Sequence, residues 1–66
     1  MKPGELRQFK TKIDGSAATR RVAGQPFMVL EVQGSAAGPA SVNFLIASGR
    51  ERGWGYDWVK LNSDPI

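Results

Sequence analysis

The sequence predicts a small all-β domain, a strongly curved antiparallel barrel of four to five strands. A chain of 66 residues forms at most one domain, so we expect residues 1–66 to be a single unit. Eight glycines and four prolines divide it into short segments, because these residues interrupt regular structure most strongly. Within the segments apolar residues alternate, as Val42, Phe44 and Ile46 do, which places them on one face of a strand.

The first part of the chain supplies two of the expected strands. Residues 6–13 lie between a Pro-Gly turn and an Asp-Gly turn and are expected to form a first strand with its cations facing water. Residues 14–26 are small, polar and basic, which predicts a long loop rather than a helix, with room for one helical turn at 17–23. Residues 26–32 are rich in β-branched and aromatic side chains and form the clearest strand.

The second part supplies the remaining elements. GSAAGPA, at 34–40, has nothing large enough to pack and is expected to be a flexible connector to a strand at 41–47, whose Leu45 faces away from the core and needs cover. A turn leads to a fourth strand at 51–56. Asp57 next offers a carboxylate to cap one helical turn. Pro65 has no N–H for a ladder, so a terminal strand there must be very short or lie at an edge.

The alternation also predicts the core. A chain this short, with only six aromatic residues, is expected to bury at least one of its two tryptophans. The predicted core residues are Leu6, Ile13, Phe27, Val29, Leu30, Val32, Val42, Phe44, Ile46 and at least one of Trp54 and Trp58.

The arrangement resembles the SH3-like fold. The segments PGEL, GQPFMVLEV, VNFLI and GWGYDWV look like short SH3-like proteins of tailed bacteriophages. In that family a strand with a tryptophan leads into one turn of 3₁₀ helix and a brief closing strand, and GWGYDWVKLNSDPI follows the same order. The resemblance implies an SH3-like barrel of four to five strands and, for a phage protein, a place in the host cytoplasm.

Two other SH3-like relatives fit less well. The plasmid-borne type of dihydrofolate reductase, a tetramer with a catalytic pore, uses a VQIY segment where this chain has VNFL at 42–45, and only the valine matches. Signalling SH3 domains bind PxxP peptides with an acidic long loop, whereas the long loop here carries Arg20 and Arg21. An oligomeric reductase remains a remote alternative, and PxxP recognition is a minor one.

Composition limits the chemistry further. The chain has no cysteine and no histidine, so disulfides and the usual zinc sites are excluded, and we expect neither cofactor nor metal. The longest apolar runs have four residues, far below the roughly 20 that a membrane helix needs. The first ten residues are polar where a signal peptide is apolar, and we expect a cytoplasmic protein.

Catalysis is not expected from a single copy. Serine lacks its usual histidine base, so the common nucleophilic triads cannot form. The carboxylates are scattered along the chain, with no spacing that brings two of them together. We therefore assign no catalytic residue.

The candidate binding residues are basic and aromatic. The net charge of +3 and pI near 9.8 suit an anionic partner. In SH3-like barrels the long first loop and the third turn border the same face, which would join two arginine pairs around one stacking platform for a base and its phosphates. The alternative interpretation of the arginines is a solvated surface. The candidate residues are Arg20, Arg21, Arg50, Arg52, Trp54 and Tyr56.

Two hypotheses on function lead. The first is a non-catalytic accessory module that binds nucleic acid, which the charge and the aromatic spacing favour. The second is a protein-interaction or self-assembling module, in a phage or host complex or as a homo-oligomer, which the small size and expected edge strands favour.

Overall fold

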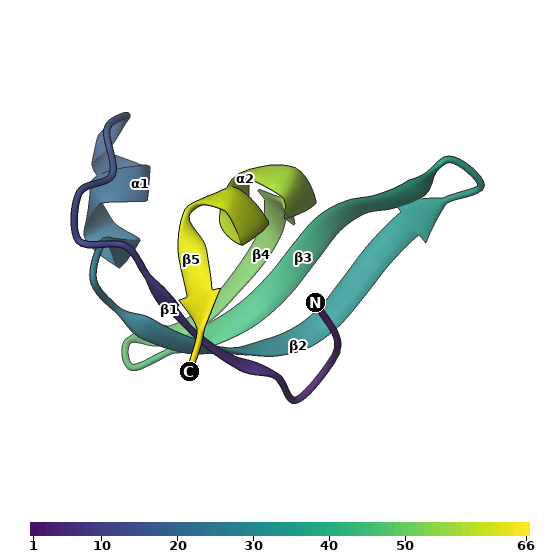
Figure 1. The fold of residues 1–66 in the computed structure, drawn as a ribbon, viewed down its shortest axis with the longest axis horizontal. Coiled ribbons are helices and arrows are strands. Elements are labelled where there is room, and N and C mark those ends of the chain that lie inside the picture. Colours follow the sequence, from purple (N-terminus) through teal and green to yellow (C-terminus); the bar gives the residue numbers. More distant parts are fainter.

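Five antiparallel strands and two short helices make up the fold (Figure 1). The structure is a computed structural model and describes all residues, 1–66. The strands form one curved sheet in the order β4-β3-β2-β1-β5, so the prediction of a small antiparallel, barrel-like all-β fold is confirmed. The elements are β1 (Leu6–Phe9), α1 (Ala17–Val22), β2 (Pro26–Ser35), β3 (Gly38–Ile46), β4 (Gly49–Gly55), α2 (Tyr56–Leu61) and β5 (Ser63–Pro65).

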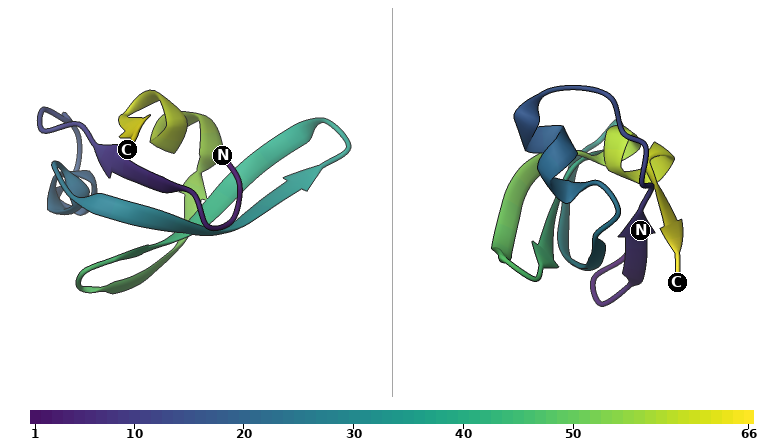
Figure 2. Two further views of the ribbon diagram at one scale, coloured as in Figure 1. Left: turned by 60° about the horizontal axis from the view of Figure 1, so that its bottom comes forward. Right: turned by 90° about the vertical axis from the view of Figure 1, so that its left-hand side faces the viewer.

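The helices lie on one side of the sheet and cover its concave face (Figures 1 and 2). Each has six residues, and neither is long and apolar enough to span a lipid bilayer. β5 pairs with β1 at one edge of the sheet and has only three residues, as expected for a strand that contains Pro65. The other face of the sheet carries no helix.

The longest elements, β2 and β3, form a hairpin that extends beyond the rest of the fold (Figure 1). The prediction of a flexible connector at 34–40 is wrong in its extent, because pairing continues to Ser35 and Gly38 and leaves only two residues as the turn. Gly34 permits this close approach, since a Cβ there would lie 2.6 Å from the carbonyl oxygen of Gly38. Small residues at this tip therefore favour tight strand pairing rather than a loose loop.

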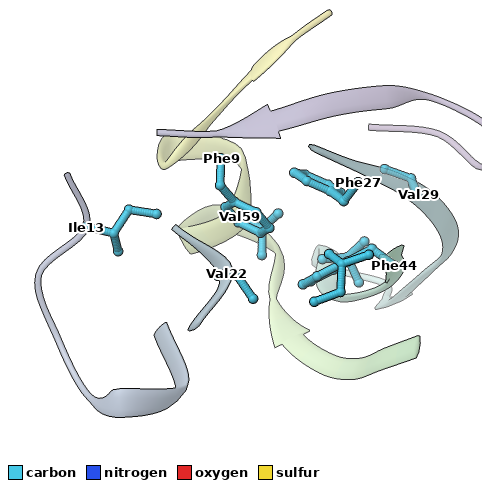
Figure 3. Close-up of a cluster of buried hydrophobic side chains, with 9 residues drawn as sticks. Phe9, Ile13, Val22, Phe27, Val29, Phe44 and Val59 are labelled. Carbon is cyan, nitrogen blue, oxygen red and sulfur yellow. The ribbon is translucent and has the colours of Figure 1, made fainter. Parts of the chain in front are cut away.

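Nine buried apolar residues form the core (Figure 3). Phe44 is fully buried, with ring centroids 4.9 Å from Phe27 and 5.4 Å from Phe9. The prediction placed at least one tryptophan in the core, but both are only half-buried and pack against this cluster without belonging to it. Six predicted members are buried, namely Ile13, Phe27, Val29, Val42, Phe44 and Ile46, and the other three members are Phe9, Val22 and Val59.

Three predicted core residues are not buried. Leu6 is 54% exposed on the outer face, because β1 turns Arg7 and Phe9 inward instead. Leu30 is half-buried at a β-bulge, where the register shifts between Val29 and Glu31. Val32 faces inward opposite Val42 but is only half-buried, because the hairpin leaves the body of the fold beyond this point.

Arg7 is the one buried cation, and it ties the first strand to the last. Its side chain donates hydrogen bonds to Ser63 Oγ and Ser63 O, both at 2.9 Å, and to Glu5 Oε2 at 2.7 Å. Ser63 Oγ in turn donates to the carbonyl oxygen of Val59 at 2.6 Å. Burial of a charge is tolerated because these partners replace water.

Three local predictions need correction. The first strand ends at Phe9 rather than Ile13, and the expected long loop contains a helix, α1, whose Val22 is fully buried. Gly24, with φ +74°, follows the helix and allows the chain to turn back towards Lys10. The element before β5 is an α-helix rather than a 3₁₀ turn, and Asp57 lies in its first turn instead of capping it.

Candidate functional site

A shallow groove of about 520 Å³ lies between α1 and the junction of β4 with α2. We call it the tryptophan groove, because both tryptophans of the chain line it. The other side chains that matter for its chemistry are Thr19, Arg21, Glu51 and Arg52. Its walls thus come from the expected long loop and from the aromatic segment near the C-terminus.

A bulge in β4 positions the first tryptophan. The register of β4 against β3 shifts by one residue before Val42 pairs with Trp54. Gly53 adopts φ +71°, a conformation that favours glycine, and its N–H donates to Asn43 Oδ1 at 2.9 Å. Asn43 is the amide that would have to replace the glutamine of the reductase motif. Here it stabilises the bulge.

The second tryptophan follows from the start of α2. Trp54 is the second-last residue of β4 and Trp58 lies in the first turn of α2, and the direct junction of the two elements leaves their ring centroids 5.5 Å apart. Trp54 also lies 5.5 Å from Phe44, and Trp58 lies 6.2 Å from Phe9. The core therefore fixes one side of each indole while part of each ring remains exposed to the groove.

An ion pair joins the two walls of the groove. Arg21 of α1 donates to Glu51 of β4 through both terminal nitrogens, at 3.0 and 2.8 Å. Trp54 Nε1 donates to the same carboxylate at 3.3 Å. The hydrogen bonds from Arg21 hold the pKa of Glu51 below its ordinary value, and the same contact raises the pKa of Arg21.

The groove contains half of the six candidate residues. Arg21, Arg52 and Trp54 line it, but Arg20 and Arg50 do not. Arg50 is exposed and pairs in register with Leu45, which faces away from the core. The predicted single platform of four arginines is therefore not assembled.

Tyr56 is also separate from the groove. Its side chain is half-buried, and its hydroxyl accepts a hydrogen bond from the Met1 amino group at 2.6 Å. Sequence reasoning did not include Trp58 among the site residues, although the spacing WGYDW carries a signal for it. The signal is only that the two tryptophans lie close in the sequence, on either side of the junction between a strand with Trp54 and a helix with Trp58.

The arrangement provides stacking surfaces and positive charge rather than a set of reactive groups. No group of three or more Asp or Glu side chains gathers to form a metal-binding cluster. The one carboxylate in the groove, Glu51, is engaged by Arg21 and Trp54. Comparisons of the chain with protein-family models, curated proteins and solved structures gave no match.

Proposed function

We propose that the chain is a non-catalytic module that binds single-stranded nucleic acid in the tryptophan groove. The observation that supports this most directly is the pair of partly exposed indoles of Trp54 and Trp58 beside Arg52. Stacking of a base on an aromatic ring contributes about 1–3 kcal/mol and tolerates any sequence, because every base has a π-face. Arg52 has no ion pair within the chain and can neutralise a backbone phosphate.

The overall charge supports the same partner. Of the nine lysines and arginines, only Arg7 and Arg21 form ion pairs, so the remaining cations add to a positive surface field. A field of this kind attracts an anionic polymer without selecting its sequence. The resemblance to tailed-phage proteins is part of this proposal and would place the module in the cytoplasm of a host cell.

Intrinsic fluorescence tests the proposal directly, because the only two tryptophans both line the groove. Titration with oligothymidylate should quench their emission, and the affinity should fall steeply with salt. Arg52→Ala should lower the slope of log K against log salt by about 0.7, the contribution of one phosphate on a single strand. Lys12→Ala removes the same charge from an exposed position outside the groove and should change the slope less.

A second variant uses the ion pair. Glu51→Gln keeps an acceptor for Trp54 but removes the charge that holds Arg21, which then becomes free to bind a phosphate. We expect tighter binding and a slope that is larger by about 0.7. Absence of salt-sensitive quenching with single-stranded DNA and RNA at low ionic strength would show that nucleic acid is not the ligand. The interaction-module hypothesis would then lead.

A further inference from the structure

The outer face of the sheet, opposite the core, carries an uncovered row of apolar residues. Leu6, Met28 and Leu45 are cross-strand neighbours on β1, β2 and β3. Ile66 extends the row beyond β5, since its N–H donates to the Leu6 carbonyl oxygen at 3.1 Å. These four residues, here called the outer apolar row, line a shallow apolar hollow of about 370 Å³. Leu6 is 54%, Leu45 is 38% and Ile66 is 74% exposed, whereas Met28 at the middle of the row is half-buried.

Opposite charges lie at the two ends of this row. Arg50 pairs with Leu45 and continues the row on β4. Asp64 pairs with Gln8, which lies on the outer face because β1 turns Arg7 and Phe9 inward. Arg50 and Asp64 are both exposed, and neither has an ion-pair partner within the chain.

We propose that two copies of this chain pack face to face through the outer apolar row. The two-fold axis lies in the interface, passes through Met28 and runs along the strands. Such an axis reverses the row, so Leu6 of one copy lies over Leu45 of the second, and Met28 meets its own counterpart. Arg50 of each copy then lies over the β5 end of the other, where Asp64 supplies the opposite charge. The same patch serves both copies, as a two-fold interface requires.

Charge selects this axis over the alternative. A two-fold axis across the strands would place Arg50 against Arg50, and like charges in contact disfavour association. Asp64 lies two residues from Ile66, about 6.6 Å along an extended strand, which is within reach of an arginine side chain. The proposed arrangement therefore buries the apolar row and also brings each Arg50 close to an Asp64 of opposite charge.

A modest dimer through this face would need to cover only a small share of the chain's surface. A stable interface covers about 600 Å² or more on each copy, which is roughly one seventh of the 4268 Å² that this chain exposes. The apolar row supplies the centre of such an area, and Arg50 and Asp64 supply its polar rim. We expect a dissociation constant in the micromolar range or higher, and a melting temperature that rises with protein concentration.

Sedimentation equilibrium from micromolar to millimolar concentrations tests the interface. The mass should rise from 7.2 kDa towards twice that value. Leu45→Glu should keep it at the monomer value, whereas Leu61→Glu, a change at an exposed leucine on α2 outside the row, should not. Circular dichroism of the dilute variants verifies that the monomer remains folded.

A charge exchange tests the axis. Arg50→Glu and Asp64→Arg should each weaken the dimer at low salt, because each places like charges together. The double variant restores opposite charges and should return the dissociation constant to near its original value. A wild-type mass of 7.2 kDa at 1 mM, or a Leu45→Glu chain that still dimerises, would overturn the interface. Failure of the double variant to recover would overturn the proposed axis.

Discussion

Replacement of Arg7 with lysine should destabilise the fold even though the charge is kept. The guanidinium directs Nε, Nη1 and Nη2 to separate partners, namely the Ser63 hydroxyl, the Glu5 carboxylate and the Ser63 carbonyl oxygen. A lysine has one nitrogen and cannot occupy three positions of a planar fork. At least one partner loses its hydrogen bond, and each such bond to a charged group contributes about 1.5–3 kcal/mol. We expect a loss of about 2–4 kcal/mol, a large part of the roughly 3–10 kcal/mol typical of a domain this small.

Urea unfolding followed by tryptophan fluorescence measures this loss. With a slope of about 1 kcal/mol per molar urea, the midpoint should fall by about 2 M or more. Arg20→Lys is the matched control, because Arg20 is exposed and its side chain makes no hydrogen bond or ion pair within the chain. Such a surface change should stay within about 0.5 kcal/mol. If Arg7→Lys is as stable as this control, the buried network does not hold the first strand to the last.

Three further predictions concern stability. Phe44→Ala removes a fully buried ring from the core and should cost about 3–5 kcal/mol, measured by the same urea titration. An unchanged midpoint would contradict the assignment of Phe44 to the core. Hydrogen bonds from arginines lower the pKa values of Glu5 and Glu51 in the folded state. The stability that these two carboxylates contribute should therefore be fully present above the ordinary glutamate pKa of about 4.3 and should be lost as the pH falls below it. In thermal melts, Glu5→Gln should show a weaker decline of the melting temperature with falling pH. Gly34→Ala should lower the melting temperature, because its Cβ would meet the Gly38 carbonyl oxygen at 2.6 Å. A higher melting temperature would show that the hairpin tip can relax.

The central strands were predictable because one physical rule decides them. Phe27 and Val29 on β2, and Phe44 and Ile46 on β3, alternate with residues that face water, and all four are buried. Period-two alternation needs no knowledge of distant contacts. The same rule fails at β1, because the apolar Leu6 and Phe9 lie three positions apart and fall on opposite faces. Phe9 faces inward together with Arg7, and Arg7 can be buried only because Ser63 binds it. Ser63 lies at the far end of the sequence, so the local pattern around β1 does not reveal it.

The candidate site was predictable only in part, since the groove contains one of the two predicted aromatic residues and two of the four predicted arginines. Trp54 follows two arginines and a glycine, and a strand that leads into a helix brings it beside Trp58. The position of Arg21 depends on the short helix α1, whose orientation is set by burial of Val22. Arg20 and Arg21 are adjacent on α1 and therefore point in different directions around the helix, so that Arg21 lines the groove and Arg20 does not. Such a difference follows from three-dimensional packing, which composition and charge spacing do not determine.

The projecting β2–β3 hairpin offers a site for attachment or labelling away from both proposed binding surfaces. Its two-residue turn lies at the end of the molecule opposite α1 (Figure 1) and lines neither the tryptophan groove nor the hollow of the outer apolar row. The chain has no cysteine, so a single Ala37→Cys substitution would introduce its only thiol at an exposed position. Through that thiol the protein can be tethered to a sensor chip or labelled with one dye, and both proposed binding surfaces remain open to solution.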